Sequence, residues 1–320
     1  MTATAVEEPI VCAETTVVAA EPLGGSFVRL VVAGRDLARW SGALMAGGTA
    51  GDAYVKLLIP PPGGGRDGSG LGVKPDAADV RGWLALPEAE RGWMRTYTVR
   101  RSGTAVVDGA SVPSITVDVV VHPGAEEGPG SAWAREVRVG DRVRVLGPGL
   151  AQSPWAAWAP GEAARVVCAG DETAAPALLA IAEELAAEPA GAREVRILVE
   201  VPTAADARAL AADARDHAPG TPGIVSVLAR GEAPGEALAR RLSWEFGLGE
   251  AAVETVLAGH RPAERDWQPA SGAAGDDPYV FLAGEAGLVR AMRRLCVDAA
   301  GIPREAVAFM GYWRRGSAES

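Results

Sequence analysis

The pattern of hydrophobic and polar positions divides the chain into two halves with different periodicity. Up to about residue 150, short runs rich in β-branched residues alternate with Gly, Pro and Asp. Such runs predict strands that end in turns. The expected strands are 11–20, 27–33, 53–59, 96–101, 115–121 and 142–146. Strands without a convincing helix between them predict an antiparallel β-barrel or sandwich.

A segment rich in Pro and Gly interrupts this β region. Residues 60–72 have the composition of a loop, and the stretch up to Trp93 has that of an insertion. Residues 68–72 (Gly-Ser-Gly-Leu-Gly) contain the glycines of a phosphate-binding loop. Because no strand leads into them and no helix follows, a flexible loop is the favoured interpretation.

After Trp155 and Trp158 the pattern changes to alternating strands and helices. Apolar strands are expected at 164–169, 195–201, 224–229, 280–283 and 306–310, and residues 173–187 have helical spacing. This alternation predicts a parallel sheet covered by helices. We therefore divide the chain into domains 1–154 and 155–320.

Charge and composition exclude several classes of protein. The formal net charge is −10 and the hydrophobic fraction is 48%. A dedicated binder of nucleic acid or of an anionic membrane needs a basic footprint, which this balance lacks. The composition is that of a globular protein, so disorder and collagen-like structure are excluded.

The cysteines and the chain start favour a cytoplasmic protein. Cys12, Cys168 and Cys296 are far apart and never form a CxxC pair, so neither a disulfide framework nor a metal site is predicted. The first residues lack a basic head followed by an apolar run, which a secretory signal requires. No stretch reaches the roughly 18 apolar residues of a membrane span.

Common catalytic motifs are absent, but one strand of the first half carries candidate chemistry. The sequence contains no GxxxxGK[ST], HExxH or GxSxG motif. In the segment Arg95-Thr96-Tyr97-Thr98, alternation places Arg95 and Tyr97 on one face of a strand. A guanidinium suits a phosphate and a tyrosine ring suits a flat cofactor. A solvated strand face is the alternative interpretation.

A second candidate segment follows His122. Small residues from Gly128 to Ala134 predict the start of a short helix. Its backbone N–H groups and the Ser131 hydroxyl are suited to a pyrophosphate, whereas a capped turn is the alternative.

The second half offers two strand ends of the same chemical type. Gly170-Asp171-Glu172-Thr173 follows the first parallel strand, and Ala283-Gly284-Glu285 ends a later one. Open α/β folds bind nucleotides at the carboxyl ends of their strands, so we expect one cleft there. Asp171 or Thr173 serving only as a helix N-cap is the alternative.

In this order, these segments resemble the siderophore-interacting protein family of flavin-dependent ferric-siderophore reductases, relatives of the ferredoxin reductases. The resemblance spans about residues 10–316. It is carried by residues 95–98 (RTYT), His122 with 130–134 (GSAWA), 140–141 (GD), 147–148 (GP), 170–174 (GDETA), 283–285 (AGE) and 310–314 (MGYWR).

The resemblance implies an N-terminal FAD-binding antiparallel β-barrel and a C-terminal α/β domain for NADH or NADPH. The implied cofactor contacts are Arg95, Tyr97, Thr98, His122, Gly130, Ser131, Ala132, Trp133, Asp171, Thr173, Glu285, Tyr312 and Trp313. For Tyr312 and Trp313, filling the interface between the domains is the alternative. Lys56 lies on the strand that the family places beside the flavin, so it is the expected contact for an anionic siderophore. An ordinary solvated lysine on a strand is the alternative.

The implied reaction is hydride transfer from the nicotinamide to FAD, followed by single-electron reduction of a ferric siderophore. No catalytic acid, base, nucleophile or metal in the protein is required. A siderophore-binding protein that does not reduce iron, and a ferredoxin-coupled reductase or one with another electron acceptor, are the alternatives. Glu200, at the end of the second parallel strand, hints at NADH because an acid there disfavours a 2′-phosphate.

Two departures from the family pattern affect these expectations. Pro123 stands where a Gly often follows the His, and Gly149 stands where a basic residue often follows Gly-Pro. The first changes the flavin loop. The second removes a charge expected near the acceptor.

Overall fold

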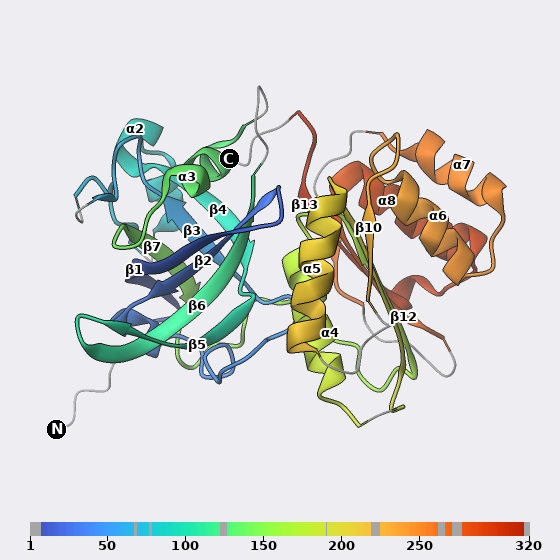
Figure 1. Ribbon diagram of the computed structural model, residues 1–320, viewed down its shortest axis with the longest axis horizontal. Coiled ribbons are helices and arrows are strands. Elements are labelled where there is room, and N and C mark those ends of the chain that lie inside the picture. Colours follow the sequence, from blue (N-terminus) through green and yellow to red (C-terminus); the bar gives the residue numbers. More distant parts are fainter. Residues whose placement is uncertain are drawn as a thin grey trace. The chain divides into compact units, whose positions relative to one another are not determined.

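The computed structural model describes residues 8–66, 69–76, 79–121, 127–189, 191–218, 225–261, 266–270 and 277–316. They divide into two compact units (Figure 1). The first unit contains the chain up to Pro22 and Phe27–Ala156, and the second contains Leu23–Ser26 and the chain from Ala157 onward. The turn between the first two strands thus belongs to the second unit.

A seven-stranded sheet of antiparallel pairs forms the first unit. Its strands are β1 (Ile10–Leu23), β2 (Phe27–Ala33), β3 (Tyr54–Ile59), β4 (Trp93–Thr98), β5 (Arg101–Val107), β6 (Ala110–Val120) and β7 (Arg142–Pro148). Their order is β4-β3-β7-β1-β2-β6-β5. The predicted antiparallel β domain is confirmed. Among the described residues, however, β4 and β5 remain the edges of the sheet, so strand pairing does not close the expected barrel.

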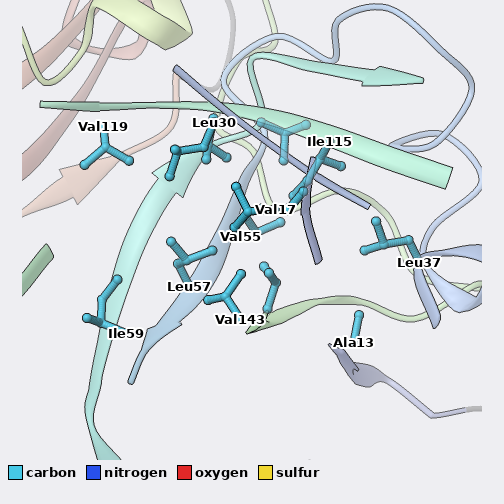
Figure 2. Packing of buried hydrophobic residues seen from close by; sticks show 14 of the residues in the cluster. Ala13, Val17, Leu30, Leu37, Val55, Leu57, Ile59, Ile115, Val119 and Val143 are labelled. Atoms are coloured by element: carbon cyan, nitrogen blue, oxygen red, sulfur yellow. The ribbon is translucent and has the colours of Figure 1, made fainter. Parts of the chain in front are cut away.

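Alternation along these strands sends one face of the sheet into a shared core. Figure 2 shows Val17, Leu30, Val55, Leu57 and Ile115 converging on one interior, where each is fully buried. Because neighbouring side chains on a strand point to opposite faces, the residue between Val55 and Leu57 must point away from this core.

The region after β4 differs from the prediction of one strand over 96–101. Strand β4 ends at Thr98, and a separate strand, β5, begins at Arg101. β5 and β6 form a hairpin whose turn residues Asp108 and Gly109 have φ of 50° and 78°. Positive φ at both positions defines a type I′ turn, for which Asp-Gly is a strong sequence signal. That dipeptide, rather than the hydrophobic run, reveals the seventh strand.

The insertion packs against the sheet in its described part. It contains the short helices α1 (Val80–Leu84) and α2 (Glu88–Arg91). Trp83 is buried in a cluster with Cys12, Leu58 and Leu146, and its indole N–H donates to the Val73 carbonyl at 2.6 Å. The part of this unit that the structure describes also contains the 3-10 helix η1 (Arg35–Arg39) and the helix α3 (Pro129–Glu136).

The second unit is built on a six-stranded sheet of order β10-β9-β8-β12-β13-β11. Its strands are β8 (Arg165–Gly170), β9 (Glu194–Val201), β10 (Val225–Ala229), β11 (Trp267–Gln268), β12 (Tyr279–Glu285) and β13 (Val307–Trp313). All neighbours are parallel except β11, which pairs antiparallel with β13. The predicted parallel α/β region is confirmed.

Helices cover both faces of this sheet (Figure 1). One face carries α4 (Ala175–Ala186) and α5 (Ala204–His217), and the other carries α6 (Glu236–Glu245), α7 (Glu250–Gly259) and α8 (Ala286–Arg294). The π-helix η3 (Leu295–Ala299) and the 3-10 helix η4 (Arg304–Ala306) connect α8 to β13. None of the helices in the described part is long and apolar enough to cross a membrane.

Candidate functional site

Strand β4 and helix α3 bring two predicted flavin segments together. Arg95 and Tyr97 share the face of β4 whose register partners are Leu57 and Val55. The first turn of α3 lies against these two side chains. A Cβ built on Gly130 would collide with the Tyr97 hydroxyl and would lie 3.7 Å from Arg95 Cγ. Glycine therefore permits this close approach between segments more than 30 residues apart in the sequence.

The N-terminal end of α3 combines two groups that favour an anion. First-turn N–H groups have no acceptor within their own helix and carry the positive end of its dipole. Arg95 adds a guanidinium, whose Nη1 donates to the Met94 carbonyl at 2.8 Å. The Ser131 hydroxyl donates to Glu127 at 3.3 Å, and Arg135 contacts the same Glu127 oxygen at 2.9 Å.

The remaining residues of this segment have different surroundings. Ala132 is exposed, whereas Trp133 is half-buried and packs against the core of the first unit. Their flavin contacts stay predictions. His122 and Pro123 lie outside the described residues.

Thr98 and Lys56 lie on the opposite face of the sheet from Arg95 and Tyr97. Thr98 is the register partner of Tyr54, and Lys56 is that of Thr96. The Lys56 ammonium donates to the Thr96 hydroxyl at 2.6 Å. The sheet at the predicted flavin segment of β4 thus has two different faces. One face carries Arg95 and Tyr97, and the other carries Lys56, the candidate siderophore contact.

These residues fit an FAD. The close contact between Gly130 and Tyr97 places a helix N-terminus beside a guanidinium, and that pairing suits a pyrophosphate. The neighbouring Tyr97 supplies an aromatic surface of the kind that a flat ring system contacts.

In the second unit, Asp171 links three segments at the carboxyl end of the sheet. Its Oδ1 accepts from the Thr173 amide at 2.9 Å and from the Thr173 hydroxyl at 2.6 Å. Its Oδ2 accepts from the Glu285 amide at 2.6 Å and from the Trp313 indole N–H at 3.0 Å. Helix α4 has Ala174 at its N-cap, so neither Asp171 nor Thr173 occupies that position, and their cofactor contacts stay predictions.

Glu285 is a second anchor at the same edge. It caps α8 by accepting from the Leu288 amide at 2.9 Å, and it contacts His260 Nε2 at 2.9 Å. Burial acts to raise the pKa of Glu285, but the hydrogen bonds from His260, Leu288 and Arg315 outweigh it and hold that pKa below its usual value. Glu285 is therefore a carboxylate at neutral pH.

The aromatic pair near the end of the chain sits where the β12–β13 register shifts. Gly284 pairs with Gly311 and Glu285 with Trp313, so Tyr312 forms a bulge. The indole of Trp313 is oriented by Asp171. The structure thus brings Asp171, Thr173, Glu285 and Trp313 into one hydrogen-bonded group. Whether Tyr312 and Trp313 contact a cofactor stays a prediction.

No sequence pattern indicated that Glu172, Glu200 and Arg230 form a charged cluster beside the carboxyl end of this sheet. Arg230 contacts both Glu172 and Glu200, the latter at 3.3 Å. Burial, reinforced by the neighbouring Asp171 carboxylate, raises the pKa of Glu172 to about 7 although Arg230 opposes the shift. These residues come from three different strand ends, so no local pattern marks them.

Glu200 does not have the exposed position that the NADH argument requires. It is fully buried and accepts from the Gly235 amide at 2.7 Å and the Leu238 amide at 3.0 Å. Its carboxylate stabilises the N-terminal end of α6, where the helix dipole is positive. The sequence-based preference for NADH therefore loses its support.

Packing explains why position 149 is a glycine. A Cβ at this position would collide with the Glu8 carbonyl oxygen. The segment before β1 occupies the space that a basic side chain would need, so the charge expected there is absent for a steric cause.

Two family models match the chain. One described as "Siderophore-interacting FAD-binding domain" matches residues 16–152, and one described as "Siderophore-interacting protein" matches residues 163–316. No curated protein matches the chain.

Solved structures resemble the chain over nearly its whole length. A siderophore utilization protein from T. fusca has a TM-score of 0.62 and 27% identity, with coverage of 98% of this chain and 96% of that chain. The siderophore-interacting protein SipS from Aeromonas hydrophila has a TM-score of 0.58 and 26% identity, with coverage of 96% and 93%. A ferredoxin reductase in carbazole 1,9a-dioxygenase shares the fold at 16% identity, with a TM-score of 0.53 and coverage of 95% and 70%.

An antiparallel β domain followed by a parallel α/β domain, together with the last of these neighbours, defines the class of proteins with the ferredoxin-reductase-like fold. Within that class, the chain belongs to the siderophore-interacting protein family. Its FAD-binding domain lies at residues 16–152, which confirms the cofactor predicted from the sequence resemblance.

Proposed function

We propose that the protein is a cytoplasmic NAD(P)H-dependent ferric-siderophore reductase. The observation that carries the proposal is the meeting of Arg95, Tyr97 and Gly130 inside a siderophore-interacting FAD-binding domain. When bound, FAD would supply the redox chemistry that matches a two-electron donor to a one-electron ferric acceptor. Three buried cysteines without a disulfide agree with a reducing compartment.

The protein's own residues bind and orient the reactants. Arg95 and the start of α3 would hold the pyrophosphate of a bound FAD, and Tyr97 would contact its flavin ring. The group formed by Asp171 and Trp313 shapes the strand-end loop where a nicotinamide nucleotide binds in folds of this kind. Because a bound FAD would supply the redox chemistry, no side chain would need to act as acid, base or nucleophile.

An anaerobic steady-state assay tests the reaction. The purified protein is supplied with FAD, a ferric siderophore, a ferrous-specific chelator and either NADH, NADPH or reduced ferredoxin. Ferrous product that depends on a nicotinamide and on FAD supports the proposal. Saturable siderophore binding without ferrous product from any donor identifies a binding protein instead, and product with ferredoxin alone identifies the ferredoxin-coupled reductase.

Lys56 is the proposed contact for an anionic ferric siderophore. Lys56→Ala should raise the apparent KM for such a chelate several-fold, corresponding to about 1 kcal/mol for a partly exposed charge, with flavin reduction unchanged. Lys74, the only other lysine, is exposed in the insertion, and Lys74→Ala is the matched control. Equal KM values for the two variants, or a parallel fall in flavin reduction, exclude this role.

A further inference from the structure

Three metal-ligating side chains meet between two helices of the second unit, within the part of the chain that the structure describes. Glu183 lies on α4, and Asp213 and His217 lie on α5. Each residue offers one ligand atom, and these three atoms lie within 4.8 Å of one another. The candidate flavin and nucleotide sites use none of these residues, so the group needs its own explanation.

Helix geometry and helix packing bring the three ligands together. Asp213 and His217 are four positions apart, so they lie on the same face of α5. Two side chains with this spacing can bind one ion from a single helix, as the two histidines of an HExxH helix do. Helices α4 and α5 pack side by side on one face of the sheet (Figure 1), and α4 thereby supplies Glu183 as the third ligand.

The spacing of Asp213 and His217 already suits a coordinated ion. Asp213 Oδ1 lies 3.3 Å from His217 Nδ1. Two ligands at about 2.0–2.2 Å from a tetrahedral ion are themselves roughly 3.3–3.6 Å apart. His217 Nδ1 also contacts the Asp213 carbonyl oxygen at 2.9 Å, so a rotation of the imidazole would exchange that contact for the ion. Rotation of the longer Glu183 side chain would close the remaining gap.

Burial and charge favour a cation at this place. The Asp213 side chain is only 5% exposed and gives the group a fixed anchor, whereas the His217 side chain is 41% exposed and lets an ion enter from solvent. His217 is the last residue of α5, where the helix dipole is negative. The negative helix end and the two acidic side chains therefore act in the same direction.

The donor atoms indicate the class of metal. One imidazole and two carboxylates suit Zn²⁺, Fe²⁺ and the other divalent first-row transition ions, whereas Mg²⁺ and Ca²⁺ prefer oxygen ligands alone. Three protein ligands leave a fourth position of a tetrahedral ion for water.

We propose that Glu183, Asp213 and His217 bind one divalent first-row transition ion and thereby link α4 to α5. The inference goes beyond the proposed function and does not rest on it, because neither FAD nor a siderophore takes part in the binding.

Equilibrium dialysis against Zn²⁺ measures the binding. Untagged full-length protein is first freed of metal with a chelator, and bound zinc is then quantified per chain. Wild type should bind one Zn²⁺ per chain, and an excess of Mg²⁺ should not displace it. Loss of even an outer-shell partner weakens metal binding about 10–100-fold, so His217→Ala and Glu183→Gln should each weaken it by at least about tenfold.

Neighbouring residues provide matched controls. Glu184 follows Glu183 on α4, but its carboxylate accepts from the Trp158 indole N–H at 2.9 Å. Asp216 precedes His217 and is exposed. Glu184→Gln and Asp216→Asn should bind Zn²⁺ as wild type does. Full binding in His217→Ala or Glu183→Gln, an equal loss in the two controls, or no stoichiometric binding by wild type would overturn the proposal.

Thermal unfolding supplies a second readout. An ion that binds the native state and not the unfolded chain stabilises the native state, so Zn²⁺ should raise the Tm of wild type and a chelator should reverse the rise. The Tm of His217→Ala should not respond. A rise of equal size in His217→Ala would show that Zn²⁺ binds elsewhere and would exclude the site.

Discussion

Removing the Asp206 carboxylate should detach the turn between β1 and β2 from the second unit. Asp206 is fully buried, and it accepts from the Gly25 and Ser26 amides at 2.7 Å each and from the Ser26 hydroxyl at 2.9 Å. It also accepts from the Thr203 amide at 3.1 Å and hydroxyl at 2.6 Å, within a capping box at the start of α5. One side chain thus ties Leu23–Ser26 to a helix N-terminus.

The expected loss follows from which donors water can reach after Asp206→Ala. Gly25 and Thr203 are exposed, so water replaces the lost acceptor there at little cost. Ser26 is buried, and its amide and hydroxyl would both lose their acceptor. An unsatisfied buried polar group costs about 1–3 kcal/mol, so the free energy of unfolding should fall by about 3 kcal/mol.

The stabilisation should also depend on pH. Burial acts to raise the pKa of Asp206, but the hydrogen bonds from Thr203, Gly25 and Ser26 outweigh it and hold that pKa below its usual value. The native state therefore binds the proton less tightly than the unfolded chain. The contribution is complete above the unfolded pKa of about 4 and is lost as pH falls through the lower folded pKa.

Urea denaturation of wild type and Asp206→Ala at pH 7 measures the loss, and hydrogen exchange of the Gly25 and Ser26 amides locates it. Asp216→Ala, on the exposed side of the same helix, is the control and should change stability by less than about 0.5 kcal/mol. Equal stabilities of the two variants, or unchanged exchange at Ser26, would refute the reasoning.

Two further predictions concern residues at the candidate sites. Because the folded pKa of Glu172 is raised to about 7, the native state keeps a proton that the unfolded chain releases, and the free energy of unfolding should fall by about 3 kcal/mol between pH 4.5 and 7. Glu172→Gln should remove that decline in urea titrations, and an unaltered slope would contradict the assignment. Gly130→Ala should weaken FAD binding about tenfold because the new methyl group displaces Tyr97. Gly128→Ala, where the methyl group meets open space, should bind FAD as wild type does, and equal FAD affinity of both variants in a dialysis assay would count against the proposed site.

The local pattern of the sequence determined the two-part architecture. Short β-branched runs bury one face of a sheet, and continuous apolar runs such as Val166–Ala169 are buried on both faces of a parallel sheet. Both signals lie within a few neighbouring residues, which is why they can be read without the fold. The Asp-Gly turn at residues 108–109 is equally local, and its chemistry marks a strand that hydrophobicity alone does not.

The candidate site residues came from short motifs, and motifs do not specify contacts. The segment at residues 95–98 indicated which face Arg95 and Tyr97 share, because alternation is a property of the strand itself. It gave no sign that Gly130 would pack against Tyr97, since that approach depends on where α3 lies. The role of Glu200 was misjudged for the same reason: the amides that it binds belong to α6, 35 residues or more further along the chain.

Only the tertiary structure decided the long-range polar contacts. The Asp171–Trp313 hydrogen bond joins residues 142 positions apart, and the bond between Ser26 and Asp206 joins residues 180 apart. Each carboxylate accepts hydrogen bonds from donors that would otherwise lack an acceptor in the folded protein. Packing of the cores determines which strand ends and turns lie close together, and therefore which donors each carboxylate meets. The sequence determined the elements and the types of chemistry that they carry, whereas the packing of those elements determined which charges meet.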